Sequence, residues 1–316
     1  MFQGFHEKLH KLTYWEFEGH DRHEGIALGL SEEELRAELQ KVPANDLFLG
    51  RYTEEDIKAA LARSGILDRL AGRGYPDLQI EVSTREVYNH RLYVYTGARD
   101  YDHILIELRL REGLFRPRRQ FLPECELAPM PMILVDWLML QDPRRGFDPA
   151  RPALPEQRHP GLGILRQLIP LVMEVVRDSG RQGVLDVPEH YHGALFYSRW
   201  FNFFNPEMGG RFQAMRRDLG AFPLQQISRG FEFNCIVDRT AGEVEKWSPG
   251  EQILPLGEKL LQYYRHPRYA ELRDRARAGH RYELDLAKLA RKVAEEEGGR
   301  AGLLAEDRPA PERRGT

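Results

Sequence analysis

Six residues in the middle of the chain have the types and spacing of a phosphate-binding loop. Arg158, Gly161 and Gly163 form the pattern R-x-x-G-x-G, directly before an apolar stretch with helical periodicity. Two glycines two residues apart let the backbone turn tightly and bring its N–H groups close to a ligand. A helix that begins here adds unpaired amides and a positive partial charge. We expect a pyrophosphate to be bound by Arg158, His159, Gly161, Leu162, Gly163 and Ile164.

The loop lies between a predicted strand and a predicted helix. Residues 132–140 are apolar on both faces, which is typical of a central strand. A proline-rich loop over 142–157 leads to the glycine pattern and to a helix over about 161–178. A short strand over 184–187 and a helix over about 192–200 follow. Upstream, alternating residues predict strands over 78–82, 91–95 and 104–110, and a final strand pair is expected around 231–237.

This order of elements resembles the GNAT superfamily of N-acetyltransferases, which have the acyl-CoA N-acyltransferase fold. The segment 155–165 looks like the family's acyl-CoA pyrophosphate loop, including the upstream Pro155. The segment 193–201 looks like the family's second helix, where Ala194 precedes Tyr197 by three residues. The resemblance covers residues 132–204 best.

The resemblance implies an α+β fold with a mixed, mostly antiparallel central sheet and helices on both faces. It also implies transfer of an acetyl or other acyl group from acyl-CoA, as co-substrate, to an amine by direct attack. Such a reaction needs a base for the amine, a donor for the oxyanion and an acid for the leaving thiolate. Tyr197 matches the position that often supplies the acid, and a phenol stays protonated at neutral pH.

Asp136 is the expected base, because it lies in the middle of the apolar strand. An isolated carboxylate there is costly to desolvate, so its pKa should rise unless the group is paired. Glu81 and Glu107, on neighbouring strands, are rivals for this role. Pairing with Arg109 or Arg111 would instead make Asp136 a structural carboxylate.

The chain departs from the family pattern at several positions. Residues 142–153 look like an insertion between the strand and the loop. Pro160 removes one N–H donor, and Pro170 should kink the helix. A non-catalytic acyl-CoA-binding or protein-interaction module is therefore the main alternative function.

Two other segments have metal-binding residue types. His6-Glu7-Lys8-Leu9-His10 matches H-E-x-x-H, in which two histidines share a helical face and the glutamate activates a zinc-bound water. A zinc peptidase is thus an outside alternative. Glu189-His190-Tyr191-His192 has metal-ligand types as well, and we interpret it as a polar loop. The expected acyltransferase site itself contains no metal.

We expect four segments along the chain. These are a helical extension over 1–50, a GNAT-like acyl-CoA-binding domain over 51–245, C-terminal helices over 246–296 and a disordered tail over 297–316. Capping-box spacing at Thr53 predicts a helix that runs to about residue 70. The tail is rich in glycine, proline and charge.

Composition limits the compartment and the partners. The 316 residues carry a net charge of −3, so we expect neither nucleic acid nor a membrane as a partner. Only two cysteines, Cys125 and Cys235, are present, which favours a reducing compartment. The chain has neither a long apolar run nor a signal-peptide pattern, so a cytoplasmic location is expected. The expected partner is a small-molecule or peptide amine, and a homodimer stays open.

Overall fold

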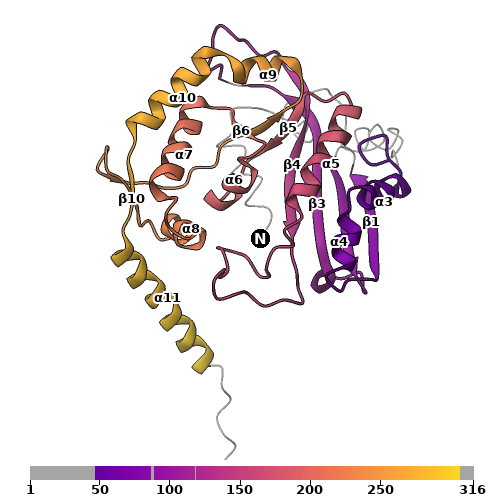
Figure 1. Ribbon diagram of the computed structural model, residues 1–316, viewed down its shortest axis with the longest axis horizontal. Helices are drawn as coiled ribbons and strands as arrows, with labels where there is room; N and C mark the ends of the chain where they lie inside the picture. The colour runs from indigo at the N-terminus through magenta and orange to yellow at the C-terminus, as the bar shows by residue number, and fades with distance from the viewer. Residues whose placement is uncertain (1–46, 87–88, 118, 307–316) are drawn as a thin grey trace, which may run out of the picture.

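The computed structural model describes residues 47–86, 89–117 and 119–306 (Figure 1). The fold is α+β, built on a seven-stranded, mostly antiparallel sheet of order β1-β2-β3-β4-β5-β9-β6. Its strands are β1 Leu78–Glu86, β2 Asn89–Thr96, β3 Ile104–Phe115, β4 Met130–Leu140, β5 Gly183–Asp186, β9 Gln252–Pro255 and β6 Asn202–Phe203. The β4–β5 pair is parallel and the other neighbours are antiparallel.

Three helices cover one face of the sheet: α3 Glu54–Arg63, α4 Ile66–Ala71 and α5 Leu165–Asp178 (Figure 1). Thr53 begins α3 with a complete capping box, as its spacing predicts. Gly65, at φ 72°, separates α3 from α4, so the single helix expected up to residue 70 is two. The α5 stripe of Leu168, Val172 and Val176 packs into the main core, which buries its apolar surface against the sheet.

The opposite face is covered near β4, β5 and β9 by α9 Glu258–Arg265 and α10 Pro267–Gly279. Leu260, Tyr263 and Tyr269 of these helices pack in a second cluster with Leu134 and Leu185. Helices therefore lie on both faces of the sheet, as expected.

A third core cluster is formed by the remaining elements. These are α6 Tyr191–Tyr197, α7 Pro206–Leu219, α8 Leu224–Glu232, α11 Leu286–Glu306 and the sheet β10-β7-β8, with β7 Ile236–Asp238, β8 Glu243–Val244 and β10 Tyr282–Leu284. A 3-10 helix, Tyr101–His103, precedes β3. None of the described helices is both long and apolar enough to cross a bilayer.

The C-terminal boundaries differ from those expected. β9 lies between β5 and β6, so a domain that ends at residue 245 would omit a central strand. Residues 246–296 contain two strands as well as helices, and α11 continues to Glu306, inside the expected disordered tail. The strand pair expected around 231–237 is mostly the end of α8 and a short β7. The helical extension predicted before residue 47 and the His6–His10 motif lie outside the described residues.

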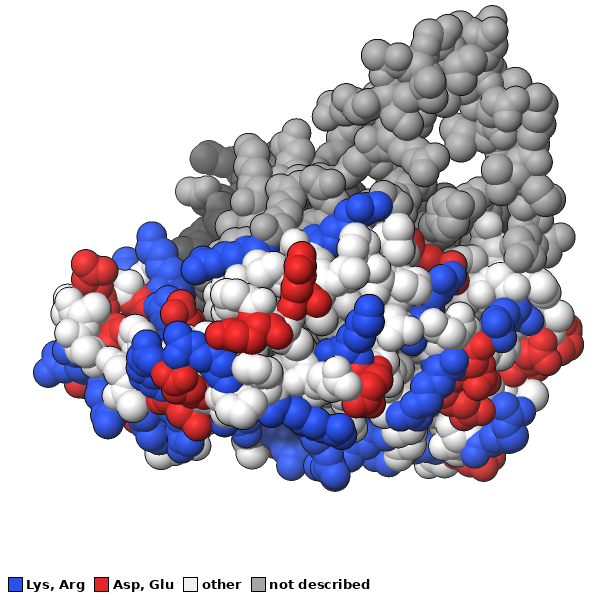
Figure 2. Space-filling view, turned by 90° about the horizontal axis from the view of Figure 1, so that it is seen from above, with Lys and Arg blue, Asp and Glu red and all other residues white. Residues whose placement is uncertain are grey.

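Charges of both signs are interspersed over the described part of the face shown in Figure 2. This distribution accords with the small net charge of −3.

Candidate functional site

The first turn of α5 has backbone amides that the rest of the described chain leaves unpaired. Ile164 is the N-cap and receives no side-chain capping bond. The N–H groups of Gly163, Leu165 and Arg166 have no acceptor among the described residues. Gly163 and Arg166 are exposed at the surface. These amides are therefore available to an anion.

The glycine loop is fastened to the end of β4. The amide of Leu162 donates to the carbonyl of Leu140 at 3.3 Å, and the amide of Asp142 donates to the carbonyl of Pro160 at 2.7 Å. A bridge between Gln141 and Gly161 closes the inserted proline-rich loop at its base. The insertion therefore leaves the strand and the loop adjacent. It also means that the amide of Leu162, expected to bind the ligand, is occupied by β4.

The side chains of the loop anchor it in two ways. Leu162 and Ile164 are buried in the main core, so they position the loop with their side chains. The guanidinium of Arg158 lies 5.8 Å from the ring centre of Tyr101. His159 is partly buried.

Two arginines from the α4 region lie beside the loop, and the glycine pattern gave no sign of them. Gly163 has φ 63°, and a Cβ built on it would lie 3.7 Å from Nη2 of Arg73 and 3.9 Å from Nη2 of Arg69. The two arginines are four residues apart, the spacing that places side chains on one face of a helix. Two guanidiniums beside free helix amides are a donor set suited to a diphosphate.

Asp142, at the end of β4, fixes one of these arginines. Its side chain is 2% exposed and lies 3.6 Å from the guanidinium of Arg73. The hydroxyl of Tyr75 donates to the same carboxylate at 2.5 Å. A second arginine, Arg145, lies 3.4 Å from it. Arg73 and Tyr75 both follow α4, whereas Asp142 and Arg145 follow β4, so the carboxylate fixes the segment after α4 against the end of β4.

β4 and β5 stay paired for only a short distance. The pairs are Ile133 with Val184 and Leu134 with Leu185, after which β5 ends at Asp186. β4 continues through residues 135–140, and no strand of the described chain pairs with it on that side. Its polar backbone edge therefore runs from the end of β5 to the glycine loop.

A bulge lies in β4 at the point where the strands part. Arg109 of β3 is opposite Trp137, whereas Leu110 is opposite Val135, so Asp136 is the extra residue. Bulges redirect side chains and bend a strand, and they are frequent next to active sites.

Asp136 is held by an arginine on the neighbouring strand. Nε and Nη2 of Arg111 donate to its Oδ2 at 3.0 and 2.7 Å. Its Oδ1 is buried and accepts no hydrogen bond from the described residues. The geometry favours the alternative of a structural carboxylate over a base.

The two rival glutamates also have partners. Glu107 is ion-paired with Arg109 and accepts a hydrogen bond from Nε1 of Trp137 at 3.1 Å. Glu81 lies 3.7 Å from Arg99. Both carboxylates therefore serve in ion pairs on the sheet.

Tyr197 lies at the C-terminal end of α6, near the last residue of β5. Its ring contacts Phe201 with centroids 5.3 Å apart and packs against the main core. Burial, and next the negative charge of Asp186, raise the pKa of Tyr197 well above its usual value. The phenol therefore keeps its proton at neutral pH, which a donor to a leaving thiolate requires, while the raised pKa also makes it a weaker acid.

Asp186 is a second ionisable group at this place, and the sequence motifs did not single it out. It is 8% exposed, and burial raises its pKa to about 7, although a backbone hydrogen bond from Val187 acts in the opposite direction. The only available signal was a carboxylate at the end of a strand of apolar residues. A carboxyl that titrates near neutrality is the usual state of a catalytic base.

The raised pKa predicts a stability effect for Asp186→Asn. Between about pH 4 and pH 7 the folded chain keeps the proton of Asp186 while the unfolded chain loses it. The cost of burying this carboxyl therefore lowers the free energy of unfolding progressively over this range, from no effect below about pH 4 to the full effect above about pH 7. A shift from 3.8 to about 7 corresponds to an effect on the order of a few kcal/mol. We expect the variant to raise the free energy of unfolding at pH 8 and to change it little near pH 4. Urea titrations at the two pH values measure this, and a loss of stability at pH 8 would contradict it.

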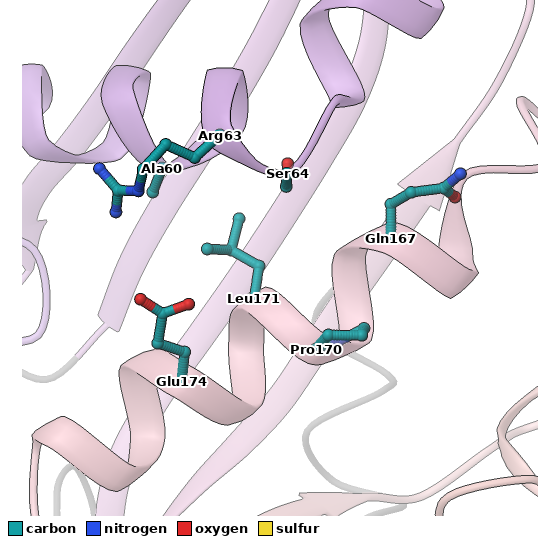
Figure 3. Close-up of a pocket in the computed structure, with 7 residues that line it drawn as sticks. All are labelled: Ala60, Arg63, Ser64, Gln167, Pro170, Leu171 and Glu174. Atoms are coloured by element: carbon teal, nitrogen blue, oxygen red, sulfur yellow. The ribbon is translucent and has the colours of Figure 1, made fainter.

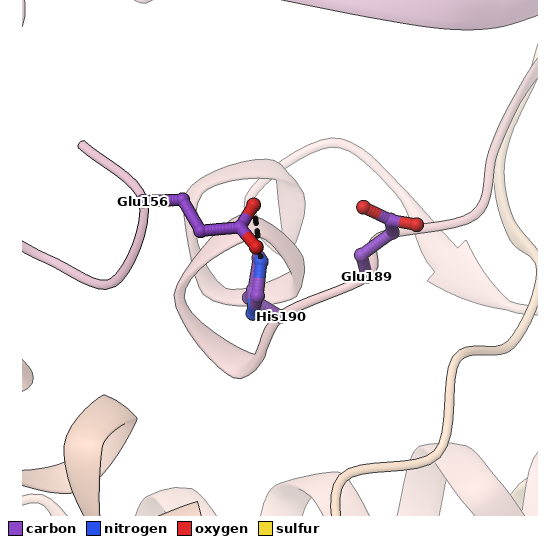
Figure 4. Close-up of side chains that lie close together, drawn as sticks. All are labelled: Glu156, Glu189 and His190. Carbon is purple, nitrogen blue, oxygen red and sulfur yellow. Dashed lines mark hydrogen bonds and ion pairs between the residues drawn. The ribbon is translucent and has the colours of Figure 1, made fainter. Parts of the chain in front are cut away.

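Glu156, Glu189 and His190 lie close together at the start of α6 (Figure 4). One ligand atom from each lies within 4.8 Å of the others. Nε2 of His190 is 3.3 Å from the carboxylate of Glu156. The backbone of Glu156 is left-handed, with φ 62°. The contact between His190 and Glu156 joins the proline-rich loop to the N-cap of α6. The interpretation of the segment 189–192 as a polar loop is wrong for its second half, because Tyr191 and His192 begin α6 and Tyr191 is buried.

A pocket of about 300 Å³ lies between α3 and α5 (Figure 3). Its lining residues are Ala60, Arg63, Ser64, Gln167, Pro170, Leu171 and Glu174. Gln167 belongs to the first turn of α5 and, with its amide correctly oriented, accepts from Nη1 of Arg69 at 2.7 Å. The pocket therefore adjoins the arginines beside the glycine loop.

No family model, no curated protein and no solved structure matches this chain.

Proposed function

We propose that this protein is an N-acyltransferase of the GNAT type, which moves an acetyl or other acyl group from acyl-CoA to an amine. The observation that carries the proposal is the set of free amides at the start of α5, with Arg69 and Arg73 beside them. This set lies at one end of the unpaired β4 edge, and Tyr197 lies near the other end, where β5 stops. A ligand with an anionic group at one end, an extended arm and a thioester at the other end fits this arrangement.

Each part of acyl-CoA has a matching group in the chain. The pyrophosphate suits the amides of Gly163, Leu165 and Arg166 and the two guanidiniums. The pantetheine arm contains two amides, which can pair with the open edge of β4 as an added strand would. The pocket between α3 and α5 adjoins the loop through Gln167, and we assign the nucleoside to it.

Tyr197 supplies the proton in the proposed reaction. The acceptor amine attacks the thioester carbonyl carbon, a C–N bond forms and the C–S bond breaks. The phenol of Tyr197 donates its proton to the departing sulfur, so the thiol leaves uncharged.

We expect acetyl-CoA to raise the melting temperature of the protein. At a ligand concentration of 100 times Kd the stabilisation is about 2.7 kcal/mol, a shift of several degrees for a chain of this size. Acetyl-pantetheine, which lacks the pyrophosphate, is the control and should give a much smaller shift. Differential scanning fluorimetry measures both.

Two results would separate the alternatives. If millimolar acetyl-CoA leaves the melting temperature unchanged, the acyl-CoA function is wrong. If it binds but the protein releases no CoA with any amine or with water, the chain is the non-catalytic acyl-CoA-binding module instead.

A further inference from the structure

Two buried oxygen acceptors without a donor lie next to each other beneath α6. Oδ2 of Asp186 accepts no hydrogen bond from the described residues, and the same is true of Oε1 of Gln252. The two residues are opposite each other in the β5–β9 register, and cross-strand partners share a face of the sheet. Nε2 of Gln252 donates to the carbonyl of Ala194 at 3.3 Å, which places α6 over that face.

Such a pair of acceptors calls for a ligand with N–H groups. Gln252 is 1% exposed and Asp186 is 8% exposed, so bulk water does not solvate them freely. A buried carboxylate oxygen without a partner is costly, so it calls for an explanation such as a bound water, an ion or a catalytic role. An aliphatic ammonium carries three N–H donors and one positive charge, which satisfies both oxygens.

We propose that Asp186 binds the acceptor as an aliphatic primary amine and takes its proton, with Gln252 orienting the amine from β9. This inference rests on the proposed acyltransferase function and names its base and its acceptor class. Asp136 also has one buried oxygen without a donor, Oδ1, but its Oδ2 accepts two hydrogen bonds from Arg111, so a cation already lies beside this carboxylate.

The protons balance through Asp186 and Tyr197. The carboxylate takes one proton from the bound ammonium, which frees the nitrogen lone pair for attack. Nitrogen bonds to the carbonyl carbon, the C–S bond breaks, and the phenol protonates sulfur. One of the two protons left on nitrogen then restores the phenol, the other stays as the amide N–H, and the proton on Asp186 passes to solvent. The products are the amide, CoA thiol and one proton.

The surroundings of Asp186 fit a group that changes charge during the reaction. The neighbours of this carboxylate are the phenol of Tyr197 on α6, the backbone amide of Val187, which donates to it, and Gln252, its partner in the β5–β9 register. None of these three is a cation. An ammonium ligand would thus be the first positive charge beside it.

The test compares Asp186→Asn with Asp136→Asn. Release of CoA from acetyl-CoA is followed with a thiol reagent between pH 5.5 and 9, first with water as the acceptor, then with alkylamines and with anilines. We expect Asp186→Asn to lower kcat with alkylamines about 100-fold or more, with KM for acetyl-CoA unchanged within about threefold. The ionisation near pH 7 should disappear in this variant and persist in Asp136→Asn. The loss should be smaller with anilines, which arrive uncharged.

Folding is checked independently by the melting temperature and by the shift that acetyl-CoA produces in each variant. The proposal for Asp186 is overturned if Asp186→Asn folds and keeps the wild-type rate, or if its profile keeps the ionisation near pH 7. It is also overturned if alkylamines and anilines lose rate equally. If the wild-type protein binds acetyl-CoA but releases no CoA at all, the proposed function itself fails, and the role of Asp186 fails with it.

Discussion

Tyr197→Phe should lower kcat about 100-fold or more while leaving acetyl-CoA affinity within about twofold of the wild type. The substitution removes only the hydroxyl, so the ring still packs against Phe201. Without the phenol, the thiolate must leave unprotonated or take a proton from water. Steady-state kinetics, together with an acetyl-CoA binding titration, separate the loss of turnover from a loss of binding.

Tyr191→Phe is the matched control, because Tyr191 lies at the other end of α6. Its ring stacks on Phe231 in the third core cluster, and burial raises its pKa to about 12. It shares with Tyr197 the helix and a raised pKa, but it packs away from the end of β5. A wild-type rate in Tyr197→Phe, or an equal loss in Tyr191→Phe, would show that the hydroxyl of Tyr197 is not the acid.

Gly163→Val should weaken acetyl-CoA binding about 100-fold, which corresponds to about 2.7 kcal/mol. The added Cβ would lie within 4 Å of the guanidiniums of Arg69 and Arg73, where we place the phosphates. A β-branched residue at φ 63° is also strained, so the loop would change its path. Isothermal titration calorimetry measures the binding directly.

Gly180→Val separates strain from the loss of the ligand site. Gly180 lies just beyond the opposite end of α5, has φ 71°, and a Cβ there meets no atom within 4 Å. Both variants should therefore lose stability by a similar 1–3 kcal/mol, roughly the cost of a left-handed non-glycine residue. Only Gly163→Val should lose affinity, and an equal loss of affinity in both would remove the phosphate site from the loop.

The sequence predicted those parts of the fold in which local pattern and tertiary packing agree. Strands β1 to β5 and helices α5 and α6 have the expected identity, because their apolar residues repeat with the period of the element that they form. The observed ends of these elements differ from the predicted ends by a few residues. Helix α5 begins at Leu165 instead of about Gly161, since Gly161 forms a bridge with Gln141 and Gly163 has a left-handed φ of 63°.

The parts that were missed depend on contacts between distant segments. Arg69 and Arg73 precede the glycine loop by about 90 residues, and they approach Gly163 because Leu70 of α4 and Leu168 of α5 share the main core. The same holds for Asp186, whose unusual pKa comes from burial under α6 and not from its neighbours in sequence. For Asp136 the sequence position suggested a base, but a distant contact changes this interpretation. Arg111 on the neighbouring strand β3 donates hydrogen bonds to the carboxylate.

The position of β9 determines when the protein can fold. β5 leaves the ribosome well before β9, and the chain between them forms α6, β6, α7, α8 and the strands β7 and β8. Until residues 252–255 emerge, β5 has an unpaired outer edge and β6 has no strand to join. Closing so long a loop is slow, because the chain loses conformational entropy before the β5–β9 contacts that compensate for this loss can form. The nascent chain thus reaches its native sheet only late in synthesis, and Asp186 stays solvated until then.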